Sequence, residues 1–297
     1  MNATLSALIR RNIKLYFKDR STFLTSLLSP MILLVLFATF LGSVYKGTLL
    51  SIVPEGMSMD DALASAFSVN WLISSLLGVS SVTVAFCSNI VMVQDRISGA
   101  VHDLLVAPVK RSTLAVSYFI ANILCTGVIC YATAAIGFAY VASIGWYFTP
   151  GDVLRILADV ALCVLFGTTL AALVQSRIRT QGASGAVSSL VSSLYGFICG
   201  AYMPIAQFGA AVRNVVSFVP GTYGTVLLRN HYLRGVLAEM SKTLPAPLID
   251  AVRDNFDVSF YFFGNRVTTW QCAAVVGAAS LVLLGAYVLV SRKQDKA

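Results

Sequence analysis

The sequence has little charge. Only 11% of its 297 residues are charged and only two are histidines, whereas 57% are hydrophobic and the mean hydropathy is +0.80. Several apolar runs reach the ~20 residues that a helix needs to cross a bilayer. So few charges cannot cover these runs with a polar surface, which excludes an ordinary soluble protein. The composition therefore predicts an all-α polytopic membrane protein.

Motifs for catalysis and nucleotide binding are also absent. The sequence has no Gly-x-x-x-x-Gly-Lys-Ser/Thr loop to cradle nucleotide phosphates, and no His-Glu-x-x-His or Gly-x-Ser-x-Gly motif. We therefore expect no enzyme activity from the chain by itself. Any ATP hydrolysis must come from another polypeptide.

Metal ligands are scarce. The six cysteines stand singly, with no Cys-x-x-Cys pair, and the topology derived below separates His102 from His231 across the membrane. We therefore expect small buried thiols and neither disulfides nor a bound metal. The cysteines are Cys87, Cys125, Cys130, Cys163, Cys199 and Cys272.

The apolar runs predict six transmembrane spans, at residues 22–45, 70–93, 114–144, 153–175, 182–201 and 268–290. Pro30 is expected to kink the first span. That span follows basic residues, as a signal peptide would, but its apolar run far exceeds the ~7–15 residues of a signal-peptide core. It is therefore predicted to remain as a membrane anchor.

The basic residues indicate the orientation. They are concentrated before the first span, between spans two and three, between spans four and five, and after span six, and such residues favour the cytoplasmic side. Both termini are therefore predicted to be cytoplasmic. The net charge of +8 reports orientation in the membrane, and no nucleic-acid partner is expected.

Residues outside the spans carry further patterns. Residues 1–20 are predicted to form an amphipathic helix on the anionic inner leaflet, with a plain basic tail as the alternative. Residues 203–219 are interrupted by polar residues, and their ~15 helical residues are too short to span. Residues 203–229 are therefore predicted as re-entrant outer helices that fold back at Pro220-Gly221, before an extracellular loop at 230–266.

Residues 94–111 form the one charged, amphipathic segment between two long apolar runs. As a single helix it places Ile97, Val101, Leu104 and Leu105 on one apolar stripe, and Pro108 ends it. This pattern suits a cytoplasmic docking element. An ordered cytoplasmic loop is the alternative.

The fifth span carries a ridge of small residues at four-residue spacing, along which another helix can approach closely. Packing within the chain and a dimer seam that opens a cargo path are the two interpretations. The ridge and an aromatic neighbour are Ser184, Ser188, Ser192, Tyr195, Gly196 and Gly200. Asn70 and Ser75 are predicted to face a cavity at the outer end of span two. Arg155 and Asp159 are predicted to pair at i, i+4.

Residues 94–111 contain Asp95-Arg96-x-x-Gly99, followed by Leu104-Leu105, Pro108 and Arg111. These residues resemble the Glu-Arg-x-x-Gly…Leu-Leu…Pro…Arg segment, with Asp in place of Glu, of one family, the type-2 ABC exporter permeases. Pro220-x-Thr222-Tyr223…Leu228-Arg229 is similar to its signature after the fifth span. The Gly-Lys pair common at the start of the third span is replaced here by Ser117-Tyr118-Phe119.

The resemblance implies a coupling helix at 94–111 that receives force from an ATPase subunit, while ATP and Mg²⁺ bind that subunit. The implied coupling residues are Asp95, Arg96, Gly99, His102, Asp103, Leu104, Leu105, Pro108 and Arg111. Two permeases, identical or paralogous, would assemble in a bacterial cell membrane. The cargo is expected to be a hydrophobic or amphipathic drug, antibiotic or peptide. Lipid-linked polysaccharide is the alternative cargo, and a non-ABC channel or scaffold is the alternative class.

Overall fold

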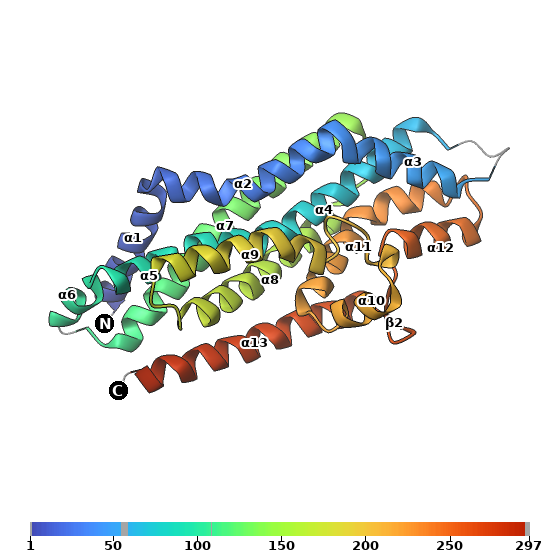
Figure 1. Cartoon of the computed structure of the whole chain (residues 1–297). Coiled ribbons are helices and arrows are strands. Elements are labelled where there is room, and N and C mark those ends of the chain that lie inside the picture. The colour runs from blue at the N-terminus through green and yellow to red at the C-terminus, as the bar shows by residue number, and fades with distance from the viewer. Residues whose placement is uncertain (1, 55–58, 108, 295–297) are drawn as a thin grey trace.

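Long apolar runs fold as helices because only a helix pairs its own backbone groups within lipid. The computed structural model describes residues 2–54, 59–107 and 109–294. Within them, five helical segments are long and apolar enough to cross a membrane: Arg20–Ile52, Asp61–Ile97, Arg111–Ile144, Pro150–Gln175 and Thr269–Ser291. The long helices run along one common direction (Figure 1). The all-α class predicted from composition is confirmed.

The helices of the described residues are α1 (Asn2–Lys18), α2 (Arg20–Leu36), the π-helix η1 (Phe37–Leu41), α3 (Gly42–Ile52), α4 (Asp61–Ser88), α5 (Ile90–Ile97), α6 (Ala100–Val106), α7 (Arg111–Ile144), α8 (Pro150–Gln175), α9 (Gln181–Ile198), the 3-10 helix η2 (Ile205–Gln207), α10 (Ala210–Val216), α11 (Pro220–Met240), α12 (Ala246–Asn255) and α13 (Thr269–Gln294). Strands β1 (Phe260–Phe262) and β2 (Asn265–Val267) form an antiparallel hairpin with Phe260 opposite Val267.

Helix α4 is the centre of the bundle. It contacts α2, α7, α8, α9 and α11, and it begins at Asp61, well before the predicted start at residue 70. Its serines are tolerated in the core because their hydroxyls donate to the helix's own carbonyls, as Ser80 does to Leu76 at 2.6 Å. Gly167 of α8 allows close approach to α4, since a Cβ there would lie 2.1 Å from the carbonyl oxygen of Ser81.

Helix α1 packs against α7 at the end of the bundle that carries α6 (Figure 1). Its amphipathic pattern is realised by the burial of Leu8 and Tyr16. The Tyr16 hydroxyl donates to Ser26 of α2 at 2.7 Å, which ties α1 to the following helix. The predicted N-terminal helix is therefore held by the bundle along one face.

Helix α9 corresponds to the predicted fifth span. It has 18 residues and lies beside α4, but it is not among the five long apolar segments found in the described residues. Its serines lower its hydropathy, and at 1.5 Å per residue it reaches about 27 Å. The structure thus supports five apolar spans by length and composition.

Helix α11 crosses the predicted boundary at residue 230. It continues to Met240 with Tyr232, Leu233 and Val236 fully buried, and it packs on α4, α8 and α13. The predicted boundary is wrong because the polar residues Arg229, Asn230 and His231 find partners inside the bundle, so the helix continues through them. Most of the predicted 230–266 loop is likewise regular structure: the end of α11, α12 and the β1–β2 hairpin.

Candidate functional site

The predicted coupling segment folds as two short helices. Helix α5 follows directly on α4, Gly99 adopts a φ of +81°, and α6 starts at Ala100. Glycine enters this left-handed conformation without a steric penalty, and the backbone turns there. The single helix predicted for 94–111 is therefore wrong. Ile97 is exposed, whereas Val101 and Leu104 pack against an apolar cluster that includes Leu8. Pro108 lies outside the described residues.

Asp95 faces inward. Both of its carboxylate oxygens accept hydrogen bonds from Arg11, at 2.6 and 2.9 Å, and the Tyr118 hydroxyl donates to it at 2.5 Å. Only 7% of Asp95 is exposed. The hydrogen bonds to this carboxylate raise the pKa of Arg11, which keeps the guanidinium charged. Asp95 thus joins α1, α5 and α7, and it presents no free surface to a partner.

Arg96 also makes contacts within the chain. Its guanidinium donates to the carbonyl oxygens of Ser176 and Ile178, at 2.8 and 3.1 Å. These carbonyls lie at the C-terminal end of α8, where a cation is favoured by the helix dipole. Arg96 therefore holds the α8–α9 connection against α5, while His102 and Asp103 on α6 are exposed.

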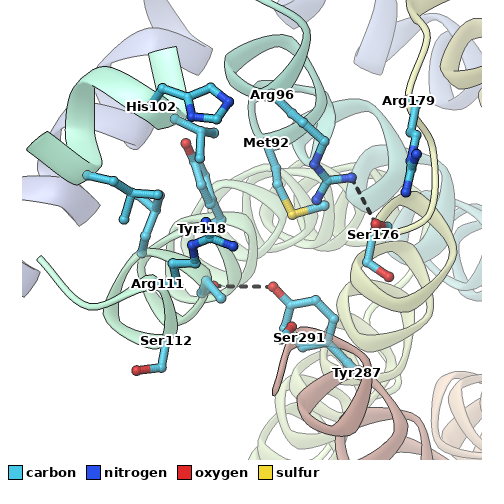
Figure 2. Close-up of a pocket in the computed structure, with 14 residues that line it drawn as sticks. Met92, Arg96, His102, Arg111, Ser112, Tyr118, Ser176, Arg179, Tyr287 and Ser291 are labelled. Atoms are coloured by element: carbon cyan, nitrogen blue, oxygen red, sulfur yellow. Dashed lines mark hydrogen bonds between the residues drawn. The ribbon is translucent and has the colours of Figure 1, made fainter. Parts of the chain in front are cut away.

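A cavity of about 510 Å³ lies beside α6. Figure 2 shows Arg96, Arg111 and Arg179 around it, contributed by α5, α7 and the α8–α9 connection. Among the described residues that line it, three are arginines and none is acidic, which gives this part of the cavity a positive potential. The described residues that line it are Met92, Arg96, Val101, His102, Leu105, Arg111, Ser112, Leu114, Ala115, Tyr118, Ser176, Arg179, Tyr287 and Ser291.

The cavity brings together only part of the predicted coupling set. Arg96, His102, Leu105 and Arg111 line it, Asp103 lies on the exposed face of α6, and Asp95 lies buried behind it. Arg179, Tyr118 and Tyr287 were not predicted as site residues. They come from segments far apart in sequence, and no local pattern marks them.

Replacing Asp95 by asparagine is expected to release α1 from the bundle. The variant loses the ion pair to Arg11, and because Arg11 is partly exposed we expect a cost of about 1–3 kcal/mol, below that of a fully buried pair. Limited trypsin digestion of the purified chain should cut faster at Arg10 and Lys14. Asp103→Asn, in the exposed part of the same segment, is the matched control, and equal digestion rates for the two variants would contradict the assignment.

A second cavity, of about 670 Å³, runs between α2, η1 and α9. We refer to it as the apolar groove. Leucine, isoleucine and phenylalanine make up half of its lining residues, and four serines of α9 add hydroxyls. Its lining is Thr25, Leu28, Ile32, Leu33, Leu36, Phe40, Leu41, Cys87, Ser188, Ser189, Ser192, Ser193, Phe197 and Tyr202.

The small-residue ridge of α9 faces mostly into its own chain. Ser184 is fully buried, Tyr195 is buried, and a Cβ on Gly196 would lie 2.3 Å from the Tyr202 ring. Gly200 has a φ of +71° and ends the helix. Ridge residues Ser188 and Ser192 reach the apolar groove. For the other members, packing within the chain is the interpretation that the structure favours.

The exposed face of α9 is apolar and lies next to the groove. Leu190, Leu194 and Phe197 are each at least half exposed. In lipid this face needs no water, and it is free to meet acyl chains or another helix.

The Pro220–Arg229 signature, which follows the predicted fifth span, begins at the turn between α10 and α11. Pro220 starts α11, where its missing N–H costs nothing. The Thr222 hydroxyl donates to Val216 at 3.0 Å, and the Tyr223 hydroxyl donates to Ser217 at 2.8 Å, so both tie α11 to α10. The motif thus sets the angle between these two helices.

Arg229 completes this motif in the core. It is fully buried, forms an ion pair with Asp257 at 3.2 Å, and donates to Ser75 at 3.0 Å and to the Gly200 carbonyl at 2.9 Å. Its guanidinium also lies 4.5 Å from the centre of the Trp71 ring. Ser75 therefore acts as a hydrogen-bond acceptor for the buried Arg229. Asn70, whose amide donates to Ala66, is buried and does not line the apolar groove either.

The predicted pair of Arg155 with Asp159 is wrong. Arg155 forms an ion pair with Asp152 at 3.3 Å. The carboxylate of Asp159 lies 2.5 Å from Nδ1 of His231 on α11. Asp152 also pairs with Arg234 at 3.0 Å. Arg155 thus keeps a local partner on α8, whereas Asp159 finds its partner on α11, because α8 and α11 pack together.

The fold and these cavities define a helical membrane protein with a positively charged cavity at one end and an apolar groove along its side. Residues 3–233 match the family model described as ABC-2 type transporter, and the chain belongs to this family. It is therefore a transmembrane component of an ABC transporter that works with ATP-binding subunits. A comparison with curated proteins found no match.

Proposed function

We propose that this chain is the permease subunit of an ATP-driven exporter that moves a hydrophobic or amphipathic molecule out of the cytoplasm or the inner leaflet. In this arrangement the chain crosses the cell membrane six times, with α9 as the fifth span and both termini cytoplasmic. ATP and Mg²⁺ bind a partner ATPase. The observation that carries the proposal is the apolar groove with its row of serine hydroxyls.

The groove suits such a cargo. Its volume of about 670 Å³ lies within the ~300–1,000 Å³ range of small-molecule sites. Apolar walls bind hydrocarbon, and the hydroxyls of Ser188 and Ser192 bind a polar end. The outer surface of α2 beside the groove is apolar and exposed, so a lipid-soluble molecule reaches the groove sideways from the leaflet.

Force from the ATPase reaches the groove through α4. Helix α6 receives the push through exposed Asp103 and the positively charged cavity. Helix α5 follows α4 with only Asn89 between them, and the Asn89 amide donates to Gln175 of α8 at 2.9 Å. Since α4 contacts both α2 and α9, tilting it changes the width of the groove.

A second permease copy, identical or paralogous, covers the apolar face of α9. Leu190, Leu194 and Phe197 border the groove and are exposed in the single chain. A partner helix on this face closes the groove on its open side. The cargo path then lies between two permeases.

The test is the ATPase activity of the complex reconstituted with its ATP-binding subunit. We expect stimulation by apolar or amphipathic drugs and peptides, and none by lipid-linked polysaccharide. Stimulation by the polysaccharide alone would replace the proposed cargo. Failure of the purified chain to bind any P-loop ATPase would reject the exporter assignment.

Replacing Ser192 by tryptophan is expected to block the groove. The larger side chain fills space that the cargo needs, so we expect cargo-stimulated ATPase activity to fall by roughly tenfold or more, which corresponds to about 1.4 kcal/mol of cargo binding. Leu281→Trp, on the exposed surface of α13 away from the groove, is the control. Unchanged stimulation in Ser192→Trp would exclude the groove as the cargo site.

A further inference from the structure

We propose that a third cavity, at the end of the bundle opposite α6, is a binding site for a phosphate group. It has a volume of about 320 Å³ and is formed by α8, α11, α12, β2 and the start of α13. Figure 1 shows α12 and β2 at this end, far from the termini and α6. We call it the arginine cavity. The inference stands independently of the proposed cargo.

Four arginines converge on the arginine cavity from four elements. Arg155 comes from α8, Arg234 from α11, Arg253 from α12 and Arg266 from β2. His231 and Asn230 share the lining, and none of the described lining residues is acidic. Like charges gathered around one small volume repel each other, so an anion in the cavity relieves that repulsion.

Carboxylates pair with arginines of the cavity, and one of them, Asp152, fixes the positions of Arg155 and Arg234. Asp152 is 1% exposed and pairs with both Arg155 and Arg234, at 3.3 and 3.0 Å. Asp159 engages His231, and Asp250 lies 3.8 Å from Arg253. These pairs compensate part of the positive charge and restrict the guanidinium groups, which lowers the entropy lost when a ligand binds.

The ligand chemistry follows from the guanidinium fork. Its parallel N–H groups match phosphate oxygens in bidentate geometry, which makes arginine the preferred partner of phosphate. The volume admits a phosphate monoester or diester headgroup. Leu154 and Trp270, next to lining residues in sequence, are 68% and 69% exposed, as expected for side chains at a membrane interface. A lipid headgroup and free phosphate offer the same chemistry.

The experiment uses the full-length chain in nanodiscs and two probes. Radiolabelled inorganic phosphate is titrated by equilibrium dialysis in phosphatidylcholine nanodiscs. Phosphatidylglycerol retention is measured by native mass spectrometry after release from mixed phosphatidylcholine–phosphatidylglycerol nanodiscs. The test variant is Arg253→Gln with Arg266→Gln, which leaves the buried Asp152 with both of its partners. The control, Arg213→Gln with Lys242→Gln, removes the same charge from exposed residues outside the cavity.

We expect wild type and control to bind at least one probe, and the test variant to bind it at least about tenfold more weakly. Loss of phosphatidylglycerol alone identifies a lipid headgroup as the occupant, and loss of inorganic phosphate identifies a free anion. The lysine pair Arg253→Lys with Arg266→Lys keeps the charge and loses the fork, so we expect intermediate binding. Equal binding by test variant and control, or no binding of either probe to wild type, overturns the proposal.

Discussion

Replacing Arg229 by methionine is expected to destabilise the folded chain by about 3–5 kcal/mol and to lower its apparent melting temperature in detergent by roughly 10 °C. The substitution removes the partner of Asp257, which is only 3% exposed, and leaves a charge without compensation in the core. It also removes the donors to Ser75 and to the Gly200 carbonyl. The loss exceeds that of any surface ion pair because water cannot replace these contacts.

The contacts of Arg229 and Asp257 connect several segments of the chain, so we expect the effects of substituting these two residues to depend on each other. The Asp257 carboxylate accepts hydrogen bonds from the backbone N–H groups of Ile205 and Ala206, which ties η2 to the residue that pairs with Arg229. Asp257 itself has a φ of +51°, a conformation that asparagine tolerates. The double variant Arg229→Met with Asp257→Asn should therefore be more stable than Arg229→Met alone. A melting temperature unchanged by Arg229→Met would show that the ion pair adds nothing to the fold.

Replacing Asp103 by arginine is expected to abolish co-purification with the ATPase and ATP-driven transport while the melting temperature of the isolated chain stays the same. Asp103 is exposed on α6, next to a cavity lined by arginines, and is the acidic residue of that helix. A reversed charge at an interface that excludes water costs several kcal/mol, so the affinity for the ATPase should fall by a factor of about 100 or more.

Two comparisons separate coupling from folding. Glu239→Arg, in a surface pair with Lys242 at the other end of the bundle, reverses a charge without an expected effect, since such pairs contribute little. Arg96→Glu should lower stability as well as coupling because Arg96 holds the α8–α9 connection. If Asp103→Arg retained both ATPase binding and transport, α6 would not be the coupling element.

The predicted coupling segment, residues 94–111, shows how much a local sequence pattern can predict. Its charge, its position between apolar runs and its similarity to a family motif were enough to single it out, and the family match agrees with that similarity. The pattern could not reveal that Asp95 is buried. The sequence does not distinguish an exposed carboxylate that binds a partner protein from a buried one that pairs with Arg11, which lies 84 residues away in the chain.

The boundary at residue 230 failed for a related reason. Polar residues at 229–231 resemble the end of a helix when only neighbours in sequence are considered. In the folded chain Arg229 meets Asp257 and His231 meets Asp159, so α11 continues through them. A buried charge is strongly destabilising unless an oppositely charged group lies next to it, and the tertiary structure decides where that group lies.

The sequence by itself determined the membrane class and the helical fold, and it singled out residues 94–111 as the predicted coupling segment, because hydrophobicity, helical period and motif order are local properties. Only the tertiary structure decided which charges are buried and paired, that the small residues of α9 mostly pack inward, and where arginines gather into cavities. Those outcomes depend on contacts between residues distant in the chain. Packing brings such residues together, and no local pattern records it.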